Sequence, residues 1–164
     1  MTIKTFIFSP FQENTYLVYD ETKEAILIDP GCLYDAEKKT LTKFIEDNYL
    51  NLKRLINTHL HLDHQFGNKY VSDTYGLQPE ACKEDEFLLE NLKDQAGKFG
   101  LTLQESAQKL GAYIIDNQEI KLVTTTGSTT YKFTVKPPAP LFKSFHPINV
   151  ADGGEITIYG DFFV

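Results

Sequence analysis

The stretch NTHLHLDH, residues 57–64, contains three of the four histidines of this 164-residue chain. Side chains two residues apart in an extended segment point to the same side. His59 and His61 are therefore predicted to share one face, and Leu60 and Leu62 the opposite face. The leucines can anchor in a core while both imidazoles face a cleft. The spacing thus predicts two ligands held side by side.

Asp63 and His64 extend this candidate site. They follow at the point where the chain is predicted to turn towards a helix, so both side chains can return to the same cavity. Imidazole nitrogens suit zinc and iron, and an added carboxylate suits a second hard or borderline cation. The stretch therefore predicts a metal site with His59, His61, Asp63 and His64 as candidate ligands.

A chance group of surface histidines and a structural zinc site both account less well for this pattern. Three of four histidines within six positions argue against chance. A structural zinc site is usually closed by paired cysteines, whereas Cys32 and Cys82 are isolated. Cys32 is expected to be a buried small residue rather than a nucleophile. His146, before Pro147 in a predicted loop, is expected to be solvated and is given no ligand role.

Composition excludes several classes of partner. The formal net charge is −7 at pH 7, so no excess of basic residues is available to bind a nucleic-acid backbone or an anionic membrane surface. No apolar run approaches the roughly 20 residues of a membrane span, and the first residues do not resemble a signal peptide. Two cysteines make no disulfide framework, so the expected location is the reducing cytoplasm.

Strand and helix patterns alternate without regular βαβ repetition, which predicts a mixed α/β layered domain. Short β-branched and aromatic runs predict strands at 3–8, 15–20, 24–29, 52–58, 112–116, 119–125, 130–135 and within 153–164. Apolar spacing predicts helices at 35–49, 66–75 and 84–100, and Thr102 with Glu105 resembles a capping box that opens a fourth helix to about Gly111. Gly127-Ser128 is a candidate hairpin turn, and the proline-rich 136–147 is expected to be irregular.

The motif THLHLDH resembles the H-x-H-x-D-H signature of the metallo-β-lactamase superfamily, which includes glyoxalase II. PFQENTYLV (10–18) and AILIDPG (25–31) are similar to the first hairpin of its glyoxalase II-like hydrolases, and GGEITIYGDFFV (153–164) to the strand pair before its third ligand motif. The resemblance implies an αββα sandwich over residues 1–164 as a single domain, with an insertion at about 104–137.

The resemblance also implies roles for individual residues. His59 and His61 would hold a first metal, and Asp63 and His64 a second. The metals would be zinc, up to two in a complete site, with iron or manganese as alternatives. The implied reaction is hydrolysis of a small acyl ester or thioester by a metal-held hydroxide. Asp63 would orient the hydroxide or pass on its proton, and Asp29 would support the ligands from behind.

The family's later ligands, a third histidine, a bridging aspartate and a late histidine, normally follow the strand pair with which this sequence ends. We therefore expect only the N-terminal half of the sandwich plus an insertion, which would expose an apolar sheet face and an unpaired edge. Three explanations are open: a second copy or a complementary chain covers them, the chain rearranges, or the sequence is a fragment of a longer protein.

Three functions compete on these grounds. The first is a glyoxalase II-like metal-dependent hydrolase of a small-molecule substrate, active when another chain supplies the missing ligands. The second is a catalytically inactive half-domain with residual metal binding or an assembly role. A di-iron oxidoreductase ranks third, because relatives with that chemistry resemble H-x-E-x-D and His61 occupies the glutamate position.

Overall fold

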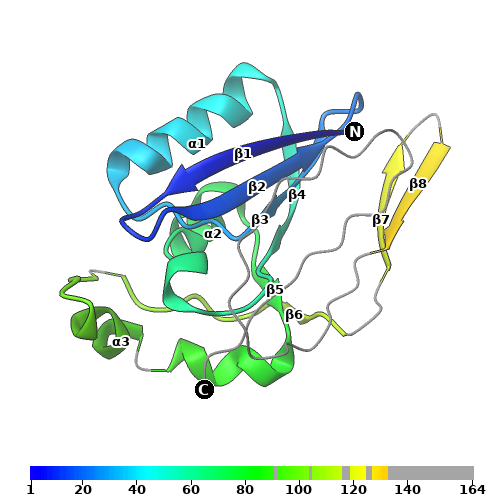
Figure 1. Ribbon diagram of the computed structural model, residues 1–164. Helices are drawn as coiled ribbons and strands as arrows, with labels where there is room; N and C mark the ends of the chain where they lie inside the picture. The colour runs from blue at the N-terminus through cyan, green and yellow to red at the C-terminus, as the bar shows by residue number, and fades with distance from the viewer. Residues whose placement is uncertain (91, 104, 116–118, 125–126, 133–164) are drawn as a thin grey trace. The chain divides into compact units, whose positions relative to one another are not determined.

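The computed structural model describes residues 1–90, 92–103, 105–115, 119–124 and 127–132, the last two ranges by their backbone alone. The chain forms two compact units, Met1–Ile114 and Ile115–Val164. The candidate ligands all belong to the first unit, which is shown with its helices and strands in Figure 1.

A six-stranded sheet forms the centre of the first unit. Its strands lie in the order in which the chain makes them, β1-β2-β3-β4-β5-β6. The first two pairings are antiparallel and the last three are parallel. The bounds are Thr2–Phe8, Glu13–Tyr19, Glu24–Ile28, Asn51–Ile56, Pro79–Ala81 and Ala112–Tyr113. The strands predicted at 3–8, 15–20, 24–29 and 52–58 are therefore confirmed, and that at 112–116 is confirmed over its first two residues.

Two helices pack against one face of this sheet. Helix α1 (Asp35–Asp47) and helix α2 (Asn68–Tyr75) bury Leu41, Ile45 and Val71. These side chains join alternate residues of the strands in one core, which contains Phe6, Phe8, Leu17, Ala25, Leu27, Leu52 and Leu55. This helix-on-sheet layer is the arrangement expected for the N-terminal half of an αββα sandwich.

The predicted helix at 35–49 ends two residues early. α1 stops at Asp47, and Tyr49 takes a left-handed backbone conformation (φ 55°) with 84% of its side chain exposed. The chain must reverse here to enter β4, and Leu50 takes the buried position instead. Tyr49 therefore does not share the buried face of the helix with Leu41 and Ile45.

The predicted helix at 84–100 is interrupted. The chain forms a 3₁₀ helix, η2 (Lys83–Leu89), and then helix α3 (Leu92–Lys98). Leu92 and Ala96 are buried as expected, but Phe87 and Phe99 are 65% and 62% exposed. Gly100 (φ 71°) ends the helical turn, and the Leu101 N–H returns to the Ala96 carbonyl, as in a C-terminal Schellman-type cap.

The fourth predicted helix, from Thr102 to about Gly111, is wrong. Residues 101–103 and 105–111, the described part of this segment, contain no helix. Leu101, Leu103 and Ala107 instead pack against a small apolar cluster formed by Leu62, Phe66, Leu92 and Ala96. An irregular chain can place these three side chains on one surface, and their burial outweighs a weak capping preference.

The second unit contains the β-hairpin predicted from sequence. β7 (Glu119–Thr124) pairs antiparallel with β8 (Gly127–Lys132), and Thr124 lies opposite Gly127. Gly127 and Ser128 therefore belong to β8 rather than to the turn. The predicted irregular segment 136–147 and the paired strands within 153–164 lie outside the described residues, and the proposed insertion at 104–137 remains a prediction.

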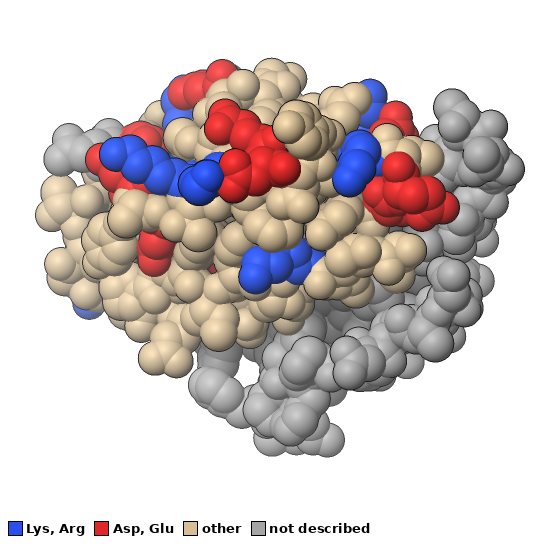
Figure 2. Space-filling view, turned by 90° about the horizontal axis from the view of Figure 1, so that it is seen from above, with Lys and Arg blue, Asp and Glu red and all other residues tan. Residues whose placement is uncertain are grey.

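On the face that carries α1, acidic and basic side chains are interspersed (Figure 2). Among the described residues, no helix combines the length and the apolar character that crossing a bilayer requires.

Candidate metal centre

The candidate ligands lie at one edge of the sheet because of the strand directions. β3 and β4 are parallel neighbours, so their carboxyl ends meet at the same edge. β3 is followed by Asp29 and β4 by the stretch 57–64. β2 runs antiparallel to β3, and its first residue, Glu13, therefore begins at this edge too. This is the edge at which open α/β sheets usually hold their ligands.

The histidines of the motif converge as predicted. Leu60 and Leu62 are 0% and 5% exposed and anchor the segment in the core. The ring centroids of His59 and His61 are 4.5 Å apart, and those of His59 and His64 are 4.0 Å apart. A short 3₁₀ helix, η1 (Leu62–His64), turns the chain back so that the ring of His64 reaches that of His59.

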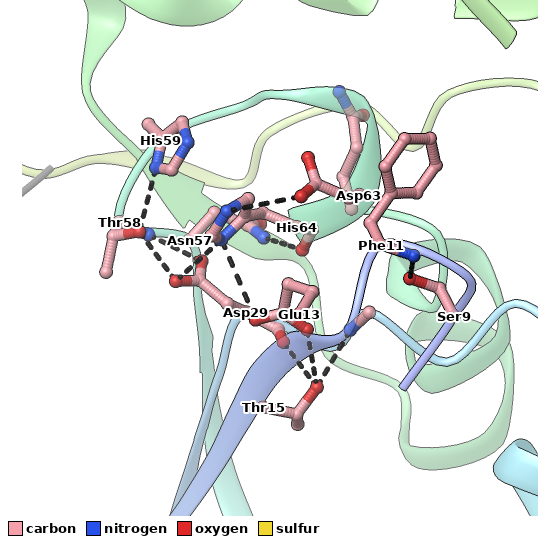
Figure 3. Close-up of polar contacts among 12 residues, drawn as sticks. Ser9, Phe11, Glu13, Thr15, Asp29, Asn57, Thr58, His59, Asp63 and His64 are labelled. Atoms are coloured by element: carbon pink, nitrogen blue, oxygen red, sulfur yellow. Dashed lines mark hydrogen bonds and ion pairs between the residues drawn. The ribbon is translucent and has the colours of Figure 1, made fainter. Parts of the chain in front are cut away.

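Asp63 lies at the same site. Its Oδ2 is 3.7 Å from His64 Nε2, and the two side chains face one another in Figure 3. Its side chain is 29% exposed, so the carboxylate is accessible from solvent. The four predicted ligands are thus brought together by one short loop, residues 57–64.

Asp29 supports this loop from the core side. It is 3% exposed and adopts a left-handed backbone conformation, φ 49°, which asparagine and aspartate tolerate better than most residues. Its Oδ1 accepts the Thr58 N–H at 2.8 Å and its Oδ2 the Thr58 hydroxyl at 2.6 Å. Oδ2 also lies 3.1 Å from His64 Nδ1 (Figure 3). The expected supporting role of Asp29 agrees with these contacts.

These contacts define which nitrogen of each ring is available. The Thr58 hydroxyl has one hydrogen, which it donates to Asp29, so it accepts at its 3.0 Å contact with His59 Nδ1. His59 then carries its proton on Nδ1 and keeps a lone pair on Nε2. His64 likewise turns Nδ1 to the carboxylate and leaves Nε2 towards Asp63. A carboxylate behind a ligating histidine is a common feature of metal sites.

The three histidines of the loop differ in their pKa values. Burial, with the neighbouring His64 charge, lowers the pKa of His59 to about 3, and burial also lowers the pKa of His61. Burial alone would lower the pKa of His64 as well, but its contact with Asp29 and the charges of Asp29 and Asp63 raise it to about 9. In the metal-free chain two rings are therefore neutral, the form that binds a metal, whereas His64 keeps a second proton that it must release before its Nε2 can bind a metal.

Three buried amides hold the loop, and no sequence pattern singled them out. Asn57 Nδ2 donates to the His64 carbonyl at 2.8 Å, and Asn68 Nδ2 donates to Asn57 Oδ1 at 2.9 Å. Gln65 Nε2 donates to the Leu60 carbonyl at 2.5 Å. All three amides are 3% exposed or less. Only their position beside the histidine motif could have suggested them.

Glu13 is a further residue that sequence reasoning missed. It is 5% exposed, and its Oε1 lies 3.7 Å from His64 Nδ1. Thr15 Oγ1 accepts the Gly31 N–H at 2.9 Å and lies 2.7 Å from the Asp29 carbonyl and 3.0 Å from Glu13 Oε2. Its single hydroxyl hydrogen can be donated to either of these two oxygens. Burial and the Asp29 charge raise the pKa of Glu13 to about 9.

The donor set of the loop fits a divalent cation on its open side. Glu13, Asp29 and His64 offer ligand atoms within 4.8 Å of one another. However, Asp29 is engaged with Thr58 and Glu13 with Thr15, so these carboxyls support the rings from behind. The Nε2 atoms of His59 and His64 and the Asp63 carboxylate remain on the other side, and nitrogen with carboxylate oxygen suits zinc, iron or manganese.

Cys32 and His146 were both given no ligand role, and only Cys32 lies among the described residues. Cys32 is fully buried, so the prediction of a buried cysteine is confirmed, and burial raises the pKa of its thiol to about 12. His146 lies outside the described residues, and its solvated role remains a prediction.

Known proteins resemble this chain over part of their length. Hydroxyacylglutathione hydrolase GloC of Haemophilus influenzae is 39% identical over 102 residues, which are 62% of this chain and 46% of that protein. A hydroxyacylglutathione hydrolase of Pelagibacter ubique is 39% identical over 77 residues, 46% of this chain and 30% of that protein. The chain therefore spans less than half the length of these relatives.

Solved structures share the fold. The B3 metallo-beta-lactamase BLEG-1 has a TM-score of 0.61 at 19% identity, over 81% of this chain and 71% of that one. TTHA1623 in a di-iron-bound form also has a TM-score of 0.61, at 20% identity, over 94% of this chain and 80% of that one. The sequence profile of the metallo-beta-lactamase superfamily matches residues 8–161. This chain is a member of the metallo-β-lactamase superfamily, with glyoxalase II-like relatives.

Proposed function

We propose that the chain is the metal-binding part of a glyoxalase II-like hydrolase that acts on a small acyl thioester or ester. The observation that carries the proposal is the contact of Asp29 with Thr58 and His64, which orients two histidine rings with Nε2 towards the open side of the site. The relatives named hydroxyacylglutathione hydrolase favour a thioester as substrate.

In this proposal His59 and His61 hold a first cation, and Asp63 and His64 a second. These residues would hold a divalent cation, which when bound would lower the pKa of a water molecule to about 7 and so make a nucleophile available at neutral pH. Zinc is the expected metal, and the di-iron form of TTHA1623 keeps iron as a candidate.

The chain's own residues supply orientation and proton transfer. Asp29 and Thr58 fix the Nδ1 proton of His59, so that the ring cannot adopt the other tautomer. Leu60 and Leu62 exclude water from behind the rings. Asp63 is the solvent-accessible carboxylate of the loop, and we assign it the transfer of a proton from the attacking water to the leaving thiolate or alkoxide.

The second candidate is a metal-binding domain without catalysis. Two protein ligands for each of two cations are one fewer than the three that a catalytic zinc usually has. Association with a second copy or with a complementary chain that completes the ligands remains part of the proposal.

The experiment is thiol release from a hydroxyacylglutathione thioester by the zinc-loaded chain. We expect turnover that Asp63→Asn lowers at least about a hundredfold, in the range of a lost general acid or base. Asp73→Asn, which removes an exposed partner of Lys69 on α2, is the matched control and should leave turnover unchanged.

Three outcomes separate the candidates. Thioester hydrolysis that depends on Asp63 supports the proposal. Metal binding without hydrolysis supports the non-catalytic candidate. Ribonuclease activity that depends on Asp63, with no thioester hydrolysis under the same conditions, would overturn the assignment of substrate class.

A further inference from the structure

A pocket separate from the metal loop opens within the first unit. Its volume is about 350 Å³, and it lies between the start of α1, the start of α2 and the segment that follows α3. His59, His61, Asp63 and His64 do not line it. A volume of this size is at the lower end of the range for small-molecule sites.

Much of the pocket lining is apolar. It includes Leu33, Phe66, Leu92, Leu101 and Leu103. Phe66 and Leu92 belong to the small apolar cluster beside η1, and the other three pack against that cluster. The pocket therefore offers a short hydrocarbon or aromatic group a surface that is already held in place.

One cation faces this apolar lining. Lys38, in the first turns of α1, has a side chain that is 14% exposed, and its Nζ lies 3.1 Å from Glu105 Oε1. The pocket's other lysine, Lys69, is paired with Asp73. The other acid that lines the pocket, Asp35, is exposed at the start of α1, so solvent screens its charge.

The partner of Lys38 comes from the irregular segment rather than from a helix or strand. Glu105 is 43% exposed, and the described residues around it form no regular structure. A glutamate in this position can turn to solvent at small cost, provided that another carboxylate takes its place. A replacement keeps the half-buried ammonium paired, whereas simple loss would leave it unpaired.

We propose that this pocket binds a small amphipathic carboxylate, which replaces Glu105 on Lys38 and places its apolar part against Leu101 and Leu103. Within the protein, Lys38 already pairs with a carboxylate, that of Glu105, which indicates that the anionic group of the ligand is also a carboxylate. The apolar lining indicates the rest of the ligand. Binding of such a ligand does not depend on the proposed hydrolase function.

The test is calorimetric titration of the 164-residue chain with hexanoate, and with 1-hexanol as the uncharged molecule of equal chain length, in the presence of EDTA. We expect saturable hexanoate binding and much weaker binding of hexanol. Lys38→Met should weaken hexanoate binding by about tenfold or more, since a hydrogen bond to a charged group is lost. Glu105→Gln should strengthen it by removing the competing carboxylate.

Lys43→Met is the matched control. Lys43 lies on the same helix, is 75% exposed and pairs with Asp47, so its removal should not change hexanoate binding. Absence of saturable binding to both the natural chain and Glu105→Gln would overturn the proposal. So would equal binding of hexanol, or binding that Lys38→Met leaves unchanged. Because EDTA removes the metal, these outcomes are distinguishable from failure of the metal-centre proposal.

Discussion

At the scale of single residues, Asp29 and Thr58 organise the candidate metal centre. Asp29 accepts two hydrogen bonds from Thr58 and faces His64, and Thr58 contacts His59. Burial alone would raise the pKa of Asp29, but the charge of His64 and the hydrogen bonds from His64 and Thr58 hold it below its usual value. One ionised carboxylate therefore orients two candidate ligands.

Thr58→Val tests this arrangement because it removes only the hydroxyl and keeps the backbone N–H bond to Asp29. His59 loses its hydrogen-bond acceptor at Nδ1, and we expect zinc affinity to fall by about 10- to 100-fold. Competition with a chromophoric chelator measures the affinity. Thr40→Val, which removes an exposed hydroxyl bonded within α1, is the control. Equal zinc affinity in the two variants would mean that Thr58 does not orient His59 for the metal.

The metal-free chain should lose stability as the pH rises from 6.5 to 9. The pKa of His64 is raised from 6.5 to about 9 and that of Glu13 from 4.5 to about 9. Both groups hold a proton in the folded chain that the unfolded chain releases. Each such proton lowers the free energy of unfolding by about 1.4 kcal/mol for every unit of pH. His59, with its pKa lowered to about 3, acts in the opposite direction only below pH 6.5.

Thermal unfolding in EDTA, followed by circular dichroism, measures this dependence. The unfolding midpoint should fall between pH 6.5 and 9, the range set by the raised pKa values of His64 and Glu13. Glu13→Gln, which cannot ionise, should make the fall shallower. Glu21→Gln in the exposed β2–β3 turn should not. A midpoint that stays constant or rises over this range would mean that the buried protons are not there.

At the scale of elements, the sequence correctly predicted the helices and strands whose local apolar pattern agrees with their packing in the fold. The strands β1 to β4 and helices α1 and α2 carry apolar residues at regular spacing, and each lies where that spacing placed it. Thr102 and Glu105 failed as a helix start because Leu101 and Leu103 gain more from packing on Phe66 and Leu92. A pattern within one segment cannot predict packing against residues that are distant in sequence.

Gly31 shows how closely the elements approach at the site. A Cβ at this position would overlap Glu13 Oε2 and would lie 2.9 Å from the Asp63 carbonyl. We expect Gly31→Ala to destabilise the chain by about 1–3 kcal/mol, the usual cost of overpacking, and to lower zinc affinity. Gly97→Ala, in an open position on α3, should be neutral or slightly stabilising. Denaturant unfolding compares them, and equal stabilities would contradict the packing described.

At the scale of the whole molecule, the sequence predicted the four candidate ligands but not the buried residues that hold them in place. His59, His61, Asp63 and His64 lie in one continuous stretch, so alternation along an extended segment and the turn that follows it were enough to place them together. The supporting residues could not be predicted, because their hydrogen bonds join segments that no sequence pattern relates: Glu13, Gln65 and Asn68. Association with itself or a complementary chain remains a prediction.

The metal content of the purified chain tests the central claim most directly. Elemental analysis should find zinc or iron bound to the natural chain and should find most of it lost in the double variant His59→Ala, His61→Ala. His146→Ala, which removes the only histidine outside the motif, should retain the metal. A natural chain without metal, or a double variant with unchanged content, would contradict the assignment of this loop as a metal centre.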